Sequence, residues 1–366
     1  MSEWKTVRLG DILLIQKKSK IKASDGIENG IYPFFTCSND IVRTYNSAQY
    51  KGPALIFGTG GKASVHFCDT EFSTSTDCLT YYPVSSEINL DLVNQYIQSN
   101  IYLLENGFKG AGLKHVSRDY IANIEINLPD IKTQNCIVQK LNKAKNIISN
   151  SKKLLTKYDT LIKSRFIEMF GDPHNNTKYP YKNVGEFTTV TSGGTPDRKN
   201  NEYWKNGKIP WVKTTELQNN ELTEVEEFIT QKGLDESSAK MMPKGTLLIA
   251  MYGQGKTRGM TAYLGIEAST NQACACILPS KEINQRYLWY YFILSYDKLR
   301  DLAKGGNQPN LNGNMIKSFP VLMPPIDMQN KYVSFVQQID KSKFAVQKSL
   351  EKTETLYKSL MQQYFA

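Results

Sequence analysis

The sequence predicts an α+β protein in which two β-rich, mixed α/β domains are joined by two long helices that pair as a coiled coil. Three observations lead to this fold class. An apolar heptad pattern runs through Ile131–Phe170, the same pattern returns 195 positions later, and each copy follows a stretch of short β-branched and aromatic runs. A period of 3.5 residues is typical of helices that wrap around one another. We therefore expect one structural unit, a domain followed by a long helix, to occur twice.

The two long helices are predicted from seams of residues that recur in steps of four and three. The first seam consists of Ile137, Leu141, Ala144, Ile148, Ser151, Leu155, Tyr158, Ile162, Arg165 and Met169. The second consists of Val336, Ile339, Lys343, Val346, Leu350, Thr353, Tyr357, Leu360 and Tyr364. Neither copy is interrupted by glycine or proline, and about 40 residues at ~1.5 Å each give a helix of roughly 60 Å. A helix that long cannot bury its seam inside a small domain, so each copy is expected to pack on the other.

The repeat extends beyond the seams and sets the expected domain boundaries. Leu-Pro-Asp-Ile at 128–131 returns as Met-Pro-Pro-Ile at 323–326, and Phe170 returns as Phe365. The offset predicts four segments: a domain at 1–127, a spacer helix at 128–171, a domain at 172–322 and a spacer helix at 323–366.

Short runs of β-branched and aromatic residues predict a similar plan for both domains. In the first domain, strands or turns are expected at 4–15, 31–36, 54–57, 65–67, 78–82 and 120–128, and a helix at 90–105. In the second, strands are expected at 245–251 and 273–278 and a helix at 286–302, and residues 316–323 lead into the second spacer helix. A glycine-rich tip joins two strands in each domain, at 58–62 and at 253–258.

The net charge of +10 is concentrated on the helical segments. Residues 1–130 carry 12 basic and 14 acidic side chains, whereas residues 131–171 carry 9 and 2. Residues 172–325 carry 18 and 15, and residues 326–366 carry 6 and 4. Nine of the ten net charges therefore lie on the two predicted helices. A basic helix suits the DNA backbone or an acidic protein partner, and a solvated helix face is the plain alternative.

Composition excludes several classes of protein. The six cysteines are scattered without a C-x-x-C pair, so they are expected to be buried, reduced thiols in a cytoplasmic protein. Only three histidines are present, so no metal site is expected. The sequence has no run of about 18 apolar residues and no secretory signal at its start, so no membrane association is expected.

The sequence contains one motif that resembles a catalytic site, but the residues around it do not fit the chemistry. The sequence Gly253-Gln254-Gly255-Lys256-Thr257 follows an apolar strand and fits a permissive phosphate-loop pattern. That chemistry needs a helix directly after Lys-Thr, but the residues that follow predict a turn and a strand. No amino-methyltransferase loop, nuclease carboxylate cluster or Ser/His/acid set stands out. Together these absences favour a binding protein over an enzyme.

Both domains offer polar loops at matching places that could read DNA bases. In the first domain the candidate residues are Thr59, Lys62, Lys109, Lys114, His115 and Arg118. In the second they are Lys213, Lys256, Thr257, Arg258, Lys304, Asn307, Gln308, Asn310 and Asn312. Each residue taken alone is more simply an exposed turn residue. The repeated placement is what singles out the set.

The second domain resembles the target-recognition domains of type I restriction–modification specificity (S) subunits. The resemblance is carried by Ser-Gly-Gly-Thr-Pro at 192–196, Glu-Tyr-Trp at 202–204, Ile-Pro-Trp-Val-Lys at 209–213, Gly-Gly-Asn-Gln-Pro-Asn-Leu at 305–311 and Met-Pro-Pro-Ile-x-x-Gln at 323–329. The first domain is similar through Tyr-Pro-Phe-Phe-Thr-Cys-Ser at 32–38 and Leu-Pro-x-Ile-x-x-Gln at 128–134. It lacks the Gly-Gly-Thr-Pro and Pro-Trp motifs, which indicates that the two domains read different bases.

The resemblance implies a non-catalytic subunit with approximate two-fold internal symmetry. Each domain would read one half of a bipartite, asymmetric site in double-stranded DNA. The two helices would pack antiparallel, set the spacing between half-sites and dock two modification (methyltransferase) subunits. Two restriction (endonuclease and translocase) subunits would complete the complex. Any S-adenosylmethionine, ATP and magnesium would belong to those partners, and none to this chain.

Two alternatives stay open. One is a stand-alone DNA-binding protein or antirestriction decoy without a methyltransferase. The other is a nucleotide-using enzyme built on residues 253–257.

Overall fold

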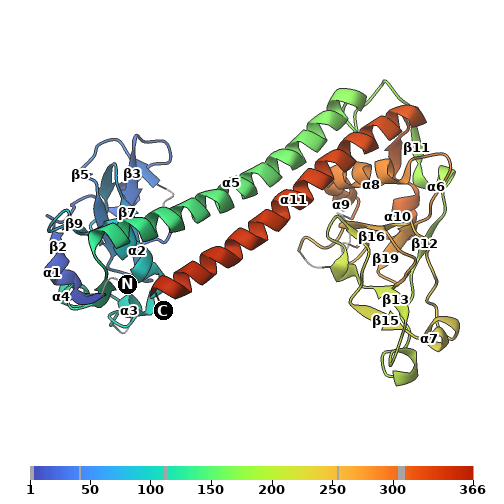
Figure 1. The fold of residues 1–366 in the computed structure, drawn as a ribbon. Helices are drawn as coiled ribbons and strands as arrows, with labels where there is room; N and C mark the ends of the chain where they lie inside the picture. The colour runs from blue at the N-terminus through green and yellow to red at the C-terminus, as the bar shows by residue number, and fades with distance from the viewer. Residues whose placement is uncertain are drawn as a thin grey trace. The chain divides into compact units, whose positions relative to one another are not determined.

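The computed structural model describes residues 4–40, 43–110, 112, 114–253, 255–303 and 310–365. The chain forms two compact units, each with its own core (Figure 1). Unit 1 consists of Met1–Lys153 and Gln347–Ala366, and unit 2 consists of Leu154–Val346. Each unit is a mixed α/β domain together with half of each long helix.

Unit 1 is built on two sheets. The first has the order β2-β9-β6-β7 and is antiparallel, with β2 (Leu13–Ile15), β6 (Ala54–Gly58), β7 (Ser64–Cys68) and β9 (Cys78–Pro83). The second has the order β4-β3-β8-β5, with β3 (Tyr32–Phe35), β4 (Arg43–Tyr45), β5 (Tyr50–Lys51) and β8 (Glu71–Thr74). Strands β1 (Lys5–Arg8) and β10 (Glu125–Leu128) pair antiparallel. This pair closes the domain just before the long helix begins.

The helices of unit 1 are short and complete its core. They are α1 (Leu9–Ile12), the 3-10 helix η1 (Ala23–Asp25), α2 (Leu90–Ser99), α3 (Tyr102–Glu105) and α4 (Arg118–Ala122). Asn89 caps α2 by accepting a hydrogen bond from Leu92 N at 3.1 Å. The apolar face of α2, with Leu92, Val93 and Ile97, is buried in the same cluster as Leu55 and other residues of the first sheet.

Unit 2 repeats this plan, with five strands in its first sheet and three in its second where unit 1 has four in each. Its first sheet has the order β12-β19-β16-β17-β14, with β12 (Val190–Ser192), β14 (Asn220–Leu222), β16 (Leu247–Ala250), β17 (Thr261–Leu264) and β19 (Cys274–Ile277). Its second has the order β15-β13-β18, with β13 (Ile209–Val212), β15 (Glu227–Ile229) and β18 (Ser269–Thr270). In both units the second sheet contains a parallel pair, β3 with β8 and β13 with β18. Strands β11 (Tyr181–Asn183) and β20 (Pro320–Leu322) correspond to the β1–β10 pair.

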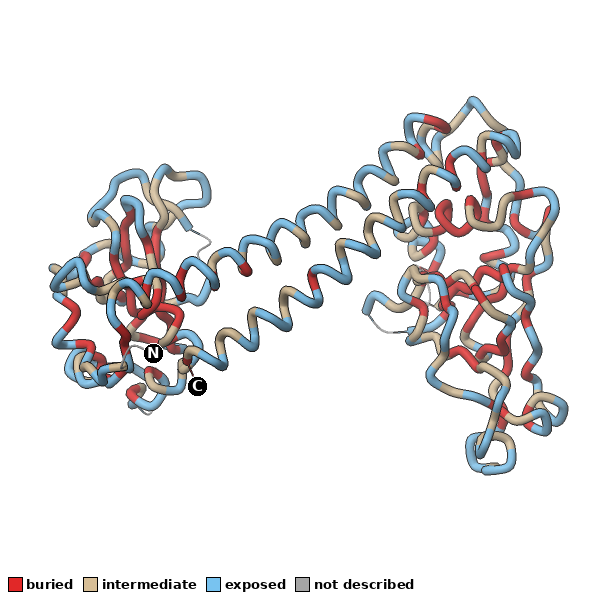
Figure 2. Tube along the Cα trace, in the orientation of Figure 1, coloured by how far each residue is buried: buried red, intermediate tan, exposed pale blue. Residues whose placement is uncertain are grey.

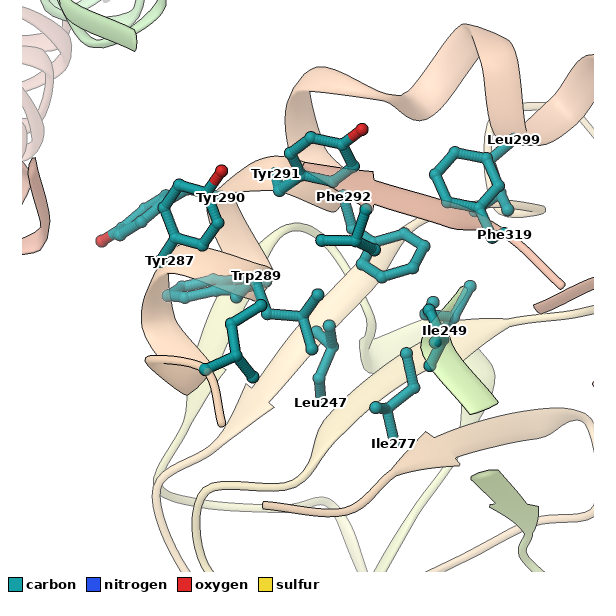
Figure 3. Packing of buried hydrophobic residues seen from close by; sticks show 14 of the residues in the cluster. Leu247, Ile249, Ile277, Tyr287, Trp289, Tyr290, Tyr291, Phe292, Leu299 and Phe319 are labelled. Atoms are coloured by element: carbon teal, nitrogen blue, oxygen red, sulfur yellow. The ribbon is translucent and has the colours of Figure 1, made fainter. Parts of the chain in front are cut away.

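The core of unit 2 is strongly aromatic. Its helices are α6 (Val184–Phe187), α7 (Gln231–Asp235), α8 (Gln285–Leu294), α9 (Tyr296–Asp301) and α10 (Gly313–Lys317), with 3-10 helices η2 (Asn201–Tyr203) and η3 (Thr214–Glu216). In Figure 3, helix α8 places Trp289 and Phe292 over Leu247, Ile249 and Ile277 of the first sheet. This packing ties the sheet of unit 2 to the helices that surround it.

A buried glutamine fixes the start of each long helix to its own domain. In unit 1, Gln134 Oε1 accepts from Asn89 N at 2.8 Å, and Gln134 Nε2 donates to Pro129 O at 2.8 Å. In unit 2, Gln329 makes the same two bonds with Asn284 N and Pro324 O, both at 2.8 Å. Both glutamines are about as buried as the core, at 2% and 1% exposed. The repeat predicted from sequence is therefore a repeat of individual hydrogen bonds.

The two long helices are α5 (Ile131–Phe170) and α11 (Ile326–Phe365), each 40 residues long. Helix α5 ends at Gly171, whose φ of +85° is a conformation that glycine adopts without strain. In Figure 2 both helices are mostly exposed, with shielded residues recurring along them. Between 146 and 164 the shielded residues are Ile148, Ser151, Leu155, Tyr158 and Ile162. These are the positions that the heptad pattern assigns to the seam.

Within each unit the two helical segments run antiparallel. In unit 1, Lys145 lies over the ring of Tyr357 at 5.8 Å, and Lys152 pairs with Glu354 at 2.8 Å. In unit 2, Asp159 pairs with Lys343, and Arg165 lies over the ring of Phe335 at 5.6 Å. As the residue number rises along α5, it falls along α11. The predicted packing residues are placed as follows: Ile137, Leu141, Val336 and Leu350 are buried, and Ile148, Leu155, Ile162, Ile339, Val346, Tyr357 and Leu360 are half-buried.

Several predicted elements differ from those observed. The strand expected at 120–128 begins as a short helix, because Ser117 caps α4 by accepting from Tyr120 N at 3.1 Å. In unit 2, Asn312 likewise caps α10 by accepting from Met315 N at 3.0 Å. The helices expected at 90–105 and 286–302 are each broken in two, giving α2 with α3 and α8 with α9. No helix in the described part of the chain is long and apolar enough to cross a membrane.

Candidate nucleic-acid interface

In unit 1 the structure joins two predicted loops into one surface. The tip between β6 and β7 carries Thr59, which is half-buried, and Lys62, which is exposed. Thr59 O accepts from Val116 N at 3.1 Å, and Gly61 N donates to Lys114 O at 3.1 Å. The loop at 109–116 is thus hydrogen-bonded along the tip, although about 50 residues separate the two in sequence.

The second loop of unit 1 is itself closed by a backbone pair. Lys109 N donates to His115 O at 2.9 Å, and His115 N donates to Lys109 O at 3.0 Å. The side chains of Lys109, Lys114 and His115 are exposed, and Arg118, also exposed, opens α4 three residues later. Five of the six candidates in the first domain therefore share one hydrogen-bonded pair of loops, and the sixth lies close to it in sequence.

In unit 2 the tip at 253–258 is held by helix α9. The hydroxyl of Tyr296 donates to Lys256 O at 2.7 Å, and Arg300 Nη1 donates to Arg258 O at 2.7 Å and to the Tyr296 hydroxyl at 3.1 Å. Lys256 is exposed, whereas Thr257 and Arg258 are half-buried. Sequence reasoning found the tip but missed the two residues that hold it, because they lie 40 or more positions away.

The phosphate-loop alternative is not supported by the local structure. The residues after Lys256-Thr257 form a turn at Gly259 (φ +85°) and then strand β17. No helix N-terminus follows the tip, so backbone amides are not aimed at a bound phosphate in the way that nucleotide binding requires.

The second loop of unit 2 lies largely outside the described residues. Lys304, Asn307 and Gln308 belong to the part that the structure does not describe. Asn310 is half-buried, and Leu311 N donates to Met251 O at 3.0 Å. Asn312, also a candidate, caps α10 and so has a structural role.

Lys213 has partners inside unit 2. Its ammonium group contacts Glu226 at 2.8 Å and Glu227 at 3.1 Å, and its side chain is 26% exposed. The hydrogen bond to Glu226 raises the pKa of Lys213. Its charge is therefore balanced within the domain, and a contact between Lys213 and DNA stays a prediction.

The motif residues of the second domain build its scaffold. Trp211 is buried and donates from Nε1 to Gly194 O at 3.0 Å. A Cβ at Gly194 would lie 2.3 Å from the backbone of Ser238, so the backbone here approaches more closely than any side chain allows. The Arg198 guanidinium lies 3.8 Å from the ring centroid of Trp204. These residues shape the domain beneath the loops.

The expectation that all six cysteines are buried is wrong for two of them. Cys136 is exposed on α5, and Cys37 is half-buried. The Cys37 sulfur donates to Asp77 O at 2.9 Å and accepts from Gly60 N at 3.4 Å, which places it at the tip of unit 1. A hydrogen bond with the Cys78 thiol lowers the pKa of Cys37 to about 6. The described residues hold no cluster of three His, Cys, Asp or Glu side chains fit to bind a metal ion.

Comparison with known proteins identifies the family. Residues 1–157 and 176–354 match the family of the type I restriction modification DNA specificity domain. The chain belongs to this family. The resemblance predicted from the motifs and the two-domain fold class are thereby confirmed. Specificity subunits are non-catalytic components of type I restriction–modification systems, and DNA recognition is their part in them.

The similarity spans nearly all of this specificity subunit in two of the relatives that follow, and less than half of it in the third. The Escherichia coli type I restriction enzyme EcoR124I/EcoR124II specificity subunit is 24% identical over 367 residues, covering 92% of this chain and 86% of its own. The MjaIX specificity subunit of Methanocaldococcus jannaschii is 31% identical over 167 residues, covering 43% of this chain and 36% of its own. The crystal structure of the S subunit from M. genitalium matches with a TM-score of 0.73 at 15% identity, covering 100% of this chain and 96% of that one.

Proposed function

We propose that this specificity subunit reads a bipartite, asymmetric site in double-stranded DNA, one half-site per unit. The observation that carries the proposal is a repeated local arrangement. The residue after the strand that leads to the tip, Thr59 in unit 1 and Met251 in unit 2, donates from its N–H at 2.8 Å to Asp77 O and Ala273 O respectively. Its carbonyl accepts from Val116 or Leu311 of the second loop in the corresponding unit.

The two interfaces are alike in backbone and different in side chains. Unit 1 presents Thr59, Lys62 and His115, whereas unit 2 presents Lys256, Thr257 and Arg258 at the equivalent tip. Base identity is read by hydrogen bonds from such side chains, while the backbone fixes their pose. Two units with the same backbone arrangement and different side chains at the tip are expected to bind two different half-sites.

We propose further that α5 and α11 set the distance between the half-sites. Each is an uninterrupted helix of 40 residues, or roughly 60 Å. Their seams are shielded within both units, and paired helices of this kind are stiff. The distance between the half-sites would then be determined by the length of these two helices.

The long helices also support a proposal that they dock modification subunits. Ile147, Leu154 and Leu161 recur every seven residues on α5 outside the seam, and they are 40%, 37% and 44% exposed. A groove of about 540 Å³ in unit 1 lies beside Ile148 and Tyr357. An exposed apolar stripe at heptad spacing suits a further helix. Because α5 is also positively charged, DNA is the alternative partner for this face of the helix.

Assembly measurements distinguish the two occupants. Leu154→Gln with Leu161→Gln should weaken co-purification of the modification subunit in the absence of DNA, whereas Lys157→Gln, an exposed change between them, should not. Unchanged assembly in the leucine variant would favour DNA as the occupant of this face.

The larger complex follows from the same proposal. Two modification subunits would supply adenine methylation with S-adenosylmethionine, and two restriction subunits would supply ATP- and magnesium-dependent cleavage, in the cytoplasm where DNA is met. These cofactors are proposed to belong to the partners, because the tip at 253–258 leads into a strand and the described residues form no metal cluster.

Sequencing of methylated adenines tests the proposal. A host expressing this chain with its modification subunit should show one bipartite motif, two defined half-sites separated by a fixed number of unspecified bases. A single uninterrupted motif, or no methylation dependent on the chain, would contradict it.

A further inference from the structure

Unit 1 carries a lysine-rich loop outside its tip and its second loop. Residues 17–22, between β2 and η1, contain Lys17, Lys18, Lys20 and Lys22. No other window of six residues in the sequence holds four basic side chains. All four lysines are exposed. The loop stands out further because residues 1–130 carry more acidic than basic side chains.

The backbone of this loop is fixed. Ser19, in its middle, is 6% exposed, donates to Gln49 Oε1 at 2.9 Å and accepts from Ile21 N at 3.1 Å. The Tyr50 hydroxyl donates to Lys17 O at 2.7 Å. Burying Ser19 while the lysines on either side of it stay in solvent makes the loop an ordered platform of positive charge. An ordered platform loses less conformational entropy on binding than a flexible charged segment.

The charges of the loop have no ion-pair partner in the described part of unit 1. None of the ion pairs found among the described residues involves these four lysines. The acidic residue next in sequence, Asp25, accepts from Lys22 N at 3.0 Å and from Ser24 Oγ at 3.3 Å, so its carboxylate serves the backbone turn. Lysines on an ordinary solvent-facing loop would also be exposed. Such a loop would have no need to hold four of them together on a fixed backbone.

The loop adjoins the tip that carries Thr59. Thr76 N donates to Ile21 O at 2.8 Å, which joins the loop to the turn before β9. The next residue, Asp77, accepts from Thr59 N and from Thr59 Oγ1, both at 2.8 Å. One residue of that turn therefore contacts the lysine loop, and the following residue contacts the tip.

We propose that residues 17–22 bind the DNA phosphate backbone beside the first half-site, through lysine ammonium groups that read no base. This inference rests on the proposed function and adds a second binding element to the tip of unit 1. A domain with excess acidic charge gains little from long-range attraction to DNA, so a local cluster must hold it on the duplex while the tip reads bases.

Unit 2 uses the equivalent position differently. Strand β12 holds the sheet position of β2, next to β19 as β2 is next to β9. It leads into Gly193 and Gly194, where an added Cβ would lie within 2.5 Å of Thr270 or Ser238. These two glycines are packed against the domain, and over the same length after the strand the segment carries two basic residues, Lys199 and Arg198, the second of which pairs with Glu227. The phosphate-binding loop is therefore assigned to the first unit alone.

Salt-dependent DNA binding by the full-length chain tests the assignment. We compare the wild-type chain, a variant with all four lysines changed to glutamine, and a matched variant with all four changed to arginine, on a random-sequence duplex. Each phosphate contact contributes about 0.9 to the slope of log affinity against log salt concentration. The glutamine variant should lose up to about 3.6 from the slope, and the arginine variant should keep it because its charge is unchanged.

A selection from a random duplex library completes the experiment. The bases selected by the glutamine variant at the first half-site should match those of the wild-type chain. An unchanged slope, an equal loss of slope in the arginine variant, or altered bases at that half-site would each overturn the assignment. Failure of the proposed function would appear instead in the wild-type chain, as selection of no bipartite site. Equal melting temperatures for the three proteins would show that a difference in salt dependence does not come from a loss of folding.

Discussion

The hydrogen bonds from α9 to the tip at 253–258 lead to a prediction about DNA binding. Tyr296→Phe removes one hydroxyl, and with it the bond donated to Lys256 O and the bond accepted from Arg300 Nη1, while Arg300 keeps its bond to Arg258 O. A tip that has lost hydrogen bonds to α9 is less ordered before DNA binds. It then loses more conformational entropy on binding, and this loss weakens the affinity. The residues Tyr296 and Arg300 thus act by positioning the tip.

The expected magnitudes follow from the kinds of bond lost. A neutral hydrogen bond contributes about 0.5–1.5 kcal/mol net, and one from a charged group about 1.5–3 kcal/mol. At about 1.4 kcal/mol per tenfold, Tyr296→Phe should weaken binding to the second half-site roughly 2- to 12-fold. Arg300→Leu should weaken it by at least about 12-fold, and Arg300→Lys should fall between, because lysine keeps the charge but not the planar fork.

Fluorescence anisotropy with three duplexes provides the assay. One carries both selected half-sites, one has the second half-site scrambled, and one has the first scrambled. The loss should appear only where the second half-site is intact. Tyr102→Phe, an exposed tyrosine of unit 1, serves as the matched control. Equal losses on all three duplexes, or no more loss than in the control, would refute the positioning role.

Three further predictions follow from the structure. Lys256→Ala with Arg258→Ala should weaken binding most on duplexes that carry the second half-site; an equal loss on random DNA would mean that both side chains contact only phosphates. One heptad added to both α5 and α11 should widen the gap in the methylated motif by about 10.5 Å, or about three base pairs, and leave the half-sites unchanged. An unchanged gap would refute the proposal that α5 and α11 set the distance between the half-sites. The Cys37 thiol should react with iodoacetamide with a midpoint near pH 6, because its lowered pKa makes it a thiolate at neutral pH. A midpoint in the ordinary range of a cysteine thiol, above about pH 8, would contradict that pKa.

Much of the architecture could be predicted from the sequence because the spacing of apolar residues along the chain indicates it. The heptad seam identified both long helices, and the offset of 195 identified the repeat, down to Gln134 and Gln329 with their matching hydrogen bonds. The glycine-rich tips were also predicted between strands. The short helices α4 and α10 were missed because each is a single turn set by a cap, Ser117 or Asn312, inside an otherwise strand-like pattern.

The sequence by itself determined the duplicated unit, the paired helices and the family. Only the tertiary structure decided which of the predicted loop residues lie together. It joined Thr59 to Val116, balanced the charge of Lys213 with two glutamates, and left the ammonium groups of Lys17, Lys18, Lys20 and Lys22 outside the ion pairs found among the described residues. The reason is physical. Periodicity reports which face of one element is buried, whereas these contacts depend on how strands and loops distant in sequence come into register, and no local pattern records that.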